Sequence, residues 1–139
     1  MADQMAEFNK RVIDEFRANG GKVGPPFAGA PMILVTHKGA KSGKTYTTPL
    51  VYSKDGDRFV IIASKAGAPN NPSWYHNLLA YPEVTLEIGV ERFRARATVA
   101  EGEERERLFS AQAQLMPQFN DYRNRTTRQI PVIVLERLK

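Results

Sequence analysis

The sequence predicts an α+β protein, mainly β, built as a small barrel with a few flanking helices. The chain has 139 residues, which is the usual size of one domain. Most segments after residue 31 have the pattern of strands, several form hairpins, and no regular alternation of strands with helices accompanies them. We therefore expect a single domain over residues 1–139, with a helix over about residues 1–20 and the barrel over about residues 31–139.

The N-terminal segment, residues 2–18, is predicted to be an amphipathic helix that ends at the glycines after Asn19. Its apolar residues recur at helical spacing: Met5, Phe8, Val12 and Phe16. Acidic and basic residues are mixed on its polar face, which favours packing on the domain and at most weak contact with a membrane. Glycines and prolines over residues 22–31 predict a loop.

The body of the chain is predicted to consist mainly of strands. Residues 32–36 are a short apolar run, and residues 46–53 contain Pro49, which restricts that strand to an edge, a bulge or a break. Turn residues over 54–57 lead to another apolar run over 59–64, so we expect these two strands to form a hairpin. The other predicted strands are residues 84–88 and 93–99, a second hairpin with Gly89 at its turn, and residues 130–135.

Two more helices interrupt the predicted strands. The first has Asn71 as its N-cap and Pro72 in its first position, and it ends near Tyr81, because Pro82 follows. The second begins with a cluster of glutamates that suits the positive end of the helix dipole, and it ends before Pro117.

Composition excludes several classes of site. With 0 cysteines and 2 histidines, the chain offers no disulfide, thiolate zinc site, iron–sulfur cluster or histidine-rich metal site, and we expect no metal. No apolar window is long enough to span a membrane, and the N-terminus is too polar for a signal peptide, so we expect a cytoplasmic protein. The net charge of +5 indicates an anionic partner.

Residues 39–45 resemble a phosphate loop but have three residues between the glycines where that motif needs four, and strand-like residues follow. We therefore reject the interpretation of this motif as that of a nucleoside triphosphatase. A tight turn with exposed glycine N–H groups beside Lys38, Lys41 and Lys44 could still receive a phosphate, and the alternative is a solvated basic hairpin.

Other candidate residues have structural alternatives. Ser64 and Lys65 follow a buried strand, where ligand contacts are common, and could equally be an ordinary strand end. Trp74 could pack in the core or flank a ligand. The strand with Arg92, Arg94 and Arg96 could bind nucleic acid, but it lacks exposed aromatic residues between the arginines, so a solvated face is favoured.

The motifs, taken in order, resemble the deazaflavin-dependent nitroreductase family. They are residues 32–36 and 39–43, Thr48-Pro49-Leu50, Ala63-Ser64-Lys65, Asn71-Pro72-Ser73-Trp74-Tyr75-His76-Asn77-Leu78, Tyr81-Pro82 and residues 130–134. The resemblance implies a split β-barrel and the coenzyme F420, whose phosphodiester and glutamates would suit a basic protein. It implies these cofactor-binding residues: Lys41, Ser42, Gly43, Lys44, Pro49, Ser64, Lys65, Ala66, Trp74 and Asn77. Ala40 and Tyr46 stand where the family often has arginine.

The resemblance further implies a reductase that passes hydride from reduced F420 to a flat, electron-poor acceptor such as a quinone, a conjugated enone or a nitroaromatic. Met116, Phe119 and Tyr122 match the segment over the family's substrate pocket, although an apolar lid is the alternative. Tyr122 or Ser64 could supply a proton. Rival hypotheses are an FMN-binding reductase or oxidase on the same barrel and a non-catalytic basic module. We expect a monomer that binds a small substrate and no nucleic acid.

Overall fold

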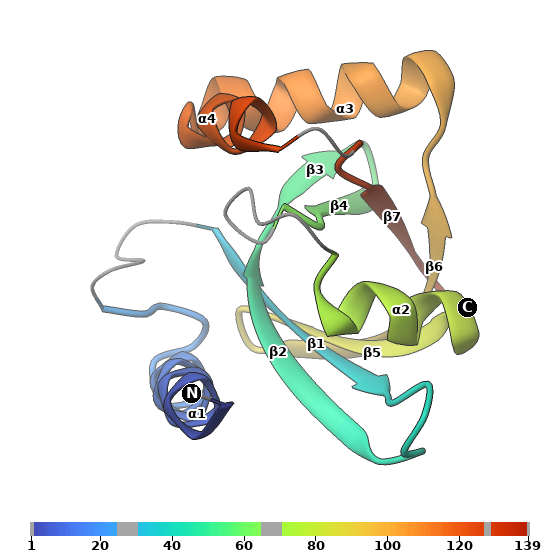
Figure 1. Ribbon diagram of the computed structural model, residues 1–139. Helices are drawn as coiled ribbons and strands as arrows, with labels where there is room; N and C mark the ends of the chain where they lie inside the picture. The colour runs from blue at the N-terminus through green and yellow to red at the C-terminus, as the bar shows by residue number, and fades with distance from the viewer. Residues whose placement is uncertain (1, 25–30, 65–70, 127–128, 139) are drawn as a thin grey trace.

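A computed structural model describes residues 2–24, 31–64, 71–126 and 129–138, and the side chains of residues 2–6 are not described. Within these residues, seven strands form one curled antiparallel sheet, and four helices flank it (Figure 1). The strands are β1 (Met32–Lys38), β2 (Thr45–Val51), β3 (Ser53–Asp55), β4 (Arg58–Ile62), β5 (Glu83–Ile88), β6 (Glu91–Val99) and β7 (Val132–Arg137). The helices are α1 (Ala2–Ala18), α2 (Ser73–Ala80), α3 (Gly102–Leu115) and α4 (Gln118–Arg125). The sheet is the half-barrel of a split β-barrel, as the sequence predicts.

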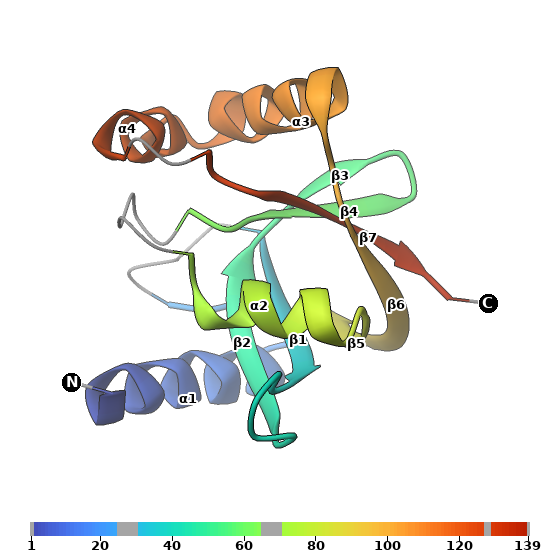
Figure 2. The ribbon, with the colours of Figure 1, turned by 45° about the vertical axis from the view of Figure 1, so that its right-hand side comes forward.

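The two edge strands of the sheet follow each other in the chain. The strand order is β2-β1-β5-β6-β7-β4-β3, and only Tyr52 separates the edge strand β2 from the edge strand β3. The Tyr52 N–H bonds to the carbonyl of Pro31 at 3.1 Å, outside the regular ladders. The chain therefore crosses from one edge of the curled sheet to the other within one residue (Figure 2). Pro49 lies in β2, an edge strand, which is one of the three arrangements that the sequence predicts for it.

The hairpin predicted between residues 46–53 and 59–64 is mostly wrong. β2 instead pairs with β1 along its whole length, from Met32↔Val51 to Lys38↔Thr45. Only the 3 residues of β3 pair with β4. The physical reason is length: the tight turn after β1 lets seven-residue strands zip together, whereas the change of direction at Tyr52 cuts the second pairing short.

Element ends also differ from the predictions. The β5–β6 hairpin forms as predicted, with Gly89 at φ 58 in its turn. The last strand begins at Val132, because the chain at Ile130 is buried without joining the ladder. Helix α2 begins at Ser73 with Pro72 as the N-cap and no side-chain cap, so Asn71 is not the N-cap.

Helices cover different faces of the sheet, and alternation along β4 shows why. Phe59 and Ile61 point to the cluster that α2 covers with Trp74 and Leu78, while Val60 and Ile62 point to the cluster under α3 and α4. A third, smaller cluster seats α1 through Val12 and Phe16 against Met32 and Leu34, as its amphipathic pattern predicts (Figure 2). Among the described helices, none combines the length and the apolarity needed to cross a bilayer.

Candidate functional site

A cavity of about 870 Å³ lies where the β1–β2 hairpin meets the first turn of α2. This is within the range of cofactor pockets. The hairpin lines it with His37, Lys41, Ser42, Tyr46 and Thr48. Helix α2 adds Ser73, Trp74, His76 and Asn77, and α1 reaches it with Asn9. Among the described lining residues there is no carboxylate, so the cavity suits an anionic ligand.

The turn over residues 39–44 is held closed by its own backbone. The Gly39 N–H bonds to the Lys44 carbonyl at 2.7 Å, and the Gly43 N–H bonds to the Gly39 carbonyl at 3.0 Å. A Cβ on Gly39 would lie 2.5 Å from the Ser42 hydroxyl oxygen and 2.9 Å from the Tyr46 ring, so a larger residue would have to displace both side chains. The expectation that the glycine N–H groups are exposed to bind phosphate is therefore wrong, because both already have carbonyl partners.

Asn77 fastens this turn to helix α2. Its Oδ1 accepts the Ala40 backbone N–H at 2.9 Å, and its Nδ2 lies 3.0 Å from His37 Nδ1. Because a backbone N–H can only donate, Asn77 must present its oxygen to Ala40 and its NH₂ to His37. His37 Nδ1 then accepts, and Nε2 carries the proton and donates it to Thr48 Oγ1 at 2.9 Å.

His37 is the main residue of the cavity that sequence reasoning missed. It is 5% exposed on β1, and this burial lowers the pKa of its imidazole from 6.5 to about 4. A buried, uncharged histidine is consistent with the hydrogen-bonding assignment, which leaves no second proton on the ring. In the sequence it lies between two other polar residues at the end of an apolar run, and its partner on α2, Asn77, is 40 residues away.

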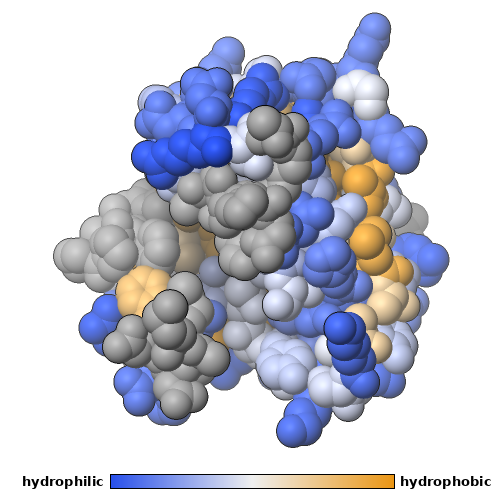
Figure 3. All heavy atoms as spheres, in the orientation of Figure 1, coloured by the Kyte–Doolittle hydropathy of each residue, from blue (hydrophilic) through white to orange (hydrophobic). Residues whose placement is uncertain are grey.

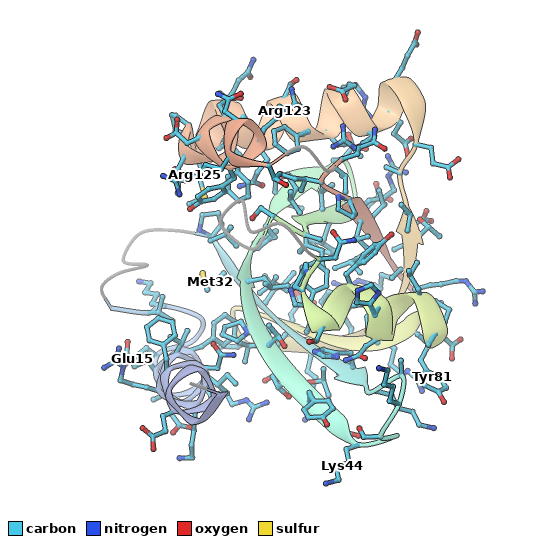
Figure 4. The ribbon with its side chains drawn as sticks, in the orientation of Figure 1. Glu15, Met32, Lys44, Tyr81, Arg123 and Arg125 are labelled. Carbon is cyan, nitrogen blue, oxygen red and sulfur yellow. The ribbon has the colours of Figure 1, made fainter. Side chains whose placement is uncertain are left out.

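The three lysines of the hairpin do not act together. Lys41 lines the cavity, whereas the Lys38 ammonium sits 4.6 Å from the centre of the Tyr81 ring. Lys44 lies at the tip of the hairpin and points away from the body of the protein (Figure 4). The side chain of Lys41 is thus the cation that the hairpin gives to the cavity.

Tyr46 lines the same cavity as Lys41 and forms part of its wall. Its hydroxyl lies 3.0 Å from that of Ser42, which also accepts the Lys44 N–H at 3.2 Å. Its ring centre is 6.0 Å from that of His37. The side chain is 44% exposed, so it gives this part of the cavity a neutral hydroxyl and an aromatic surface.

The remaining predicted cofactor residues are dispersed. Gly43 and Pro49 belong to the hairpin without lining the cavity. Trp74 packs in the core at 8% exposure, as its structural alternative expects, and it also lines the cavity. Ser64 is buried just after β4. Lys65 and Ala66 lie outside the described residues.

The predicted acceptor residues lie elsewhere, on and just before α4, and do not line this cavity. Phe119 is 4% exposed in the core below α3 and α4, as the lid alternative expects. Met116 and Tyr122 are half-buried at the edge of the same cluster, and the Tyr122 ring meets that of Phe119 edge-on at 5.3 Å.

A second hollow of about 230 Å³ lies between α2 and β6. Leu79 and Val99 are its most exposed apolar side chains. Figure 3 shows a hydrophobic band at the right of the molecule. None of the described residues that line the hollow is charged, so it is unsuited to an anion. The face of β6 with Arg92, Arg94 and Arg96 is solvated as expected, and Arg94 pairs with Glu83 at 3.4 Å.

Comparison with known proteins identifies the family. The sequence profile of F420H(2)-dependent quinone reductases matches residues 9–137. The chain belongs to the F420H(2)-dependent quinone reductase family. It is therefore an F420H(2)-dependent reductase whose cofactor is reduced F420, which confirms the enzyme class and the cofactor predicted from the sequence.

Individual relatives agree with this family. An F420H(2)-dependent quinone reductase of Mycobacterium tuberculosis is 39% identical over 126 residues, which cover 88% of this chain and 85% of that protein. A solved F420-H2 dependent reductase is 37% identical, with a TM-score of 0.71, and the match covers 76% of this chain and 94% of that one. Another solved relative, described as a domain-swapped dimer, is 33% identical with a TM-score of 0.73, covering 97% and 98% of the two chains. At least one relative therefore forms a dimer.

The hairpin cavity fits the cofactor of the F420H(2)-dependent quinone reductase family. The tail of F420 carries a phosphodiester and glutamates, and the cavity offers the Lys41 ammonium, hydroxyl groups and no described carboxylate. Trp74 adds aromatic surface for a flat ring system.

Proposed function

We propose that this protein reduces quinones and conjugated enones with reduced F420, and nitroaromatics less well. The observation that carries the proposal is the cavity at the β1–β2 hairpin, which combines Lys41, hydroxyl donors and aromatic walls without a described carboxylate. Membership of the F420H(2)-dependent quinone reductase family supports the quinone as acceptor. When bound, reduced F420 supplies a hydride.

Lys41 and Ser42 bind the anionic tail of the cofactor, with Lys65 as a second cation, while Trp74 and Asn77 flank the cavity from α2. A charge-assisted contact of this kind is typically worth about 1.5 to 3 kcal/mol. Lys41→Ala and Lys65→Ala are each expected to weaken F420 binding at low salt. Lys54→Ala is the matched control, because it removes one positive charge from β3, outside the cavity.

On the acceptor side, the neighbourhood of Tyr122 decides which substrates are accepted. Hydride transfer to a quinone or enone leaves an oxyanion, which takes up a proton. Tyr122, Ser64 or water supplies that proton. Of Met116, Phe119 and Tyr122, only the tyrosine has a hydroxyl, so a polar nitro group finds few donors while an apolar ring has a surface to contact.

Oxidation of reduced F420 by menadione, a cyclic enone and a nitroimidazole, followed by absorbance, tests the substrate range. We expect kcat/KM to be higher for menadione and the enone than for the nitroimidazole, and faster reduction of the nitroimidazole would overturn the assignment. Tyr122→Phe should lower kcat more than it weakens F420 binding. A variant with full activity would remove Tyr122 from the chemistry.

Calorimetric titration with F420 and FMN tests the cofactor site independently of the acceptor. We expect F420 to bind and FMN to bind at least about tenfold more weakly, because FMN lacks the tail carboxylates. Tighter binding of FMN would favour the rival flavoenzyme, and binding of an oligonucleotide without turnover would favour the non-catalytic module.

We also propose that the protein is a monomer with one domain. Light scattering at the mass of one chain and a single unfolding transition would support this.

A further inference from the structure

The cavity contains a buried chain of hydrogen bonds that includes His37 and Thr48, two residues to which the proposed function gives no role. It runs from Thr48 on β2 through His37 on β1 and Asn77 on α2 to the backbone N–H of Ala40, with lengths of 2.9, 3.0 and 2.9 Å. It joins the two strands, the helix and the turn that together form the cavity wall. His37 is 5% exposed and Asn77 is 9% exposed, so both side chains are largely withdrawn from water.

Each donor in this chain of hydrogen bonds has one acceptor, which fixes the orientation of the Asn77 amide and the tautomer of His37. Ala40 N–H requires the oxygen of Asn77, the NH₂ of Asn77 requires an unprotonated Nδ1 on His37, and the proton on Nε2 goes to Thr48. The opposite tautomer would place an N–H of His37 against the NH₂ of Asn77. Rotation of the Asn77 amide would relieve that clash only by pointing its NH₂ at the Ala40 N–H.

The surroundings of His37 favour this uncharged form. From β2 it faces the Tyr46 ring, and His76 of α2 and Lys41 of the turn line the same cavity. The carboxylates of the adjacent strand β5 are engaged elsewhere, Glu87 with Arg17 at 2.8 Å and Glu83 with Arg94 at 3.4 Å. No described carboxylate lines the cavity to stabilise a charged imidazole.

We propose that His37 is a positioning residue of the cofactor site, which acts through Asn77 to hold the turn over residues 39–44, and with it Lys41, against helix α2. The proposal rests on the proposed binding of F420 at this hairpin. His37 acts by setting the orientation of the Asn77 amide. Once that amide is free to rotate, the Ala40 N–H loses its fixed acceptor, and the turn has one tether fewer to α2.

The variants for the test separate the hydrogen bonding of the His37 side chain from its packing. His37→Gln keeps one acceptor and one donor without a titratable ring, whereas His37→Leu removes both. Thr47→Val is the matched control, because the Thr47 hydroxyl makes an equivalent 2.9 Å bond to Thr36 between the same two strands and does not line the cavity. F420 dissociation constants are measured by calorimetry with the intact protein.

We expect His37→Leu to weaken F420 binding about five- to tenfold, the loss of one net hydrogen bond, while His37→Gln and Thr47→Val stay within about twofold of the parent. In the Asn77→Leu background, His37→Leu should add nothing, because its effect passes through Asn77. Nitrogen NMR shifts of His37 should report the tautomer with its proton on Nε2.

Three results would overturn the proposal: a proton on Nδ1, an equal loss from His37→Leu in the presence and absence of Asn77, or unchanged binding in His37→Leu while Lys41→Ala weakens it. If Lys41→Ala is also unchanged, the failure lies in the proposed site. If His37→Leu does not fold, the NMR tautomer and the affinity of His37→Gln still decide, since a Gln variant weakened as much as Asn77→Leu refutes the positioning role.

Discussion

Acidification should destabilise this protein through one buried side chain. The His37 pKa is about 4 in the folded protein and 6.5 as a free side chain. At a pH between these two values, His37 is protonated in the unfolded chain and neutral in the folded protein, so the free energy of unfolding falls as the pH falls. The contribution of neutral His37 to the free energy of unfolding is therefore fully present above pH 6.5 and is lost progressively as the pH falls to about 4.

The expected loss can be worked from those two pKa values. Between about pH 7.5 and about pH 4.5, the proton linkage of His37 amounts to about 2 to 3 kcal/mol. That is a large share of the roughly 5 to 15 kcal/mol by which domains are stable. Asp55 does not interfere, because its bonds to Arg107 and Arg58 hold its pKa well below 3.8, and its contribution is lost only below that pH.

Urea unfolding of the parent and of His37→Gln at both pH values measures the effect. The comparison cancels the ordinary surface carboxylates, which both proteins share. We expect the parent to lose about 2 to 3 kcal/mol more than the variant over this range. Equal pH dependence in the two proteins would refute the claim that His37 is buried in its neutral form.

Three other substitutions have defined expectations. Gly21→Ala should cost at least about 2 kcal/mol more in urea unfolding than Gly56→Ala, because both have positive φ but only at Gly21 would the new Cβ lie 2.6 Å from backbone, whereas Gly56 has nothing within 4 Å. Arg105→Lys should cost about 1 to 3 kcal/mol, since the buried guanidinium donates both Nε and Nη2 to the Ile130 carbonyl and an ammonium cannot reproduce that fork. Tyr46→Arg should tighten F420 binding in calorimetry, with a gain that shrinks as salt rises, and a salt-independent gain would place the tail elsewhere.

Local patterns predicted much of the fold. The helical spacing of Val12 and Phe16, and the alternation along β5 and β6, depend on neighbours a few residues apart, and both are confirmed. The positions of Lys41, Trp74 and Asn77 could be matched to a family because their motifs are short and contiguous.

Contacts between distant segments could not be predicted in the same way. The pairing of β2 with β1 in place of β4 depends on where the chain turns at Tyr52, which no periodicity reveals. The hydrogen bond between His37 and Asn77 joins residues that are 40 positions apart in the sequence. The sequence around the histidine therefore gave no sign of its partner. The satisfied amides of Gly39 and Gly43 are likewise visible only once the turn has closed.

The position of β7 in the sheet has a consequence for folding kinetics. In the described sheet, β7 alone joins the β2-β1-β5-β6 section to the β4-β3 section. Its partner β4 ends at Ile62, and β7 begins at Val132, so this pairing closes a very long loop. The two sections can form hairpins early, but they remain separate until residues 132–137 insert between them. We therefore expect the formation of the barrel to be a late, slow step that needs almost the whole sequence.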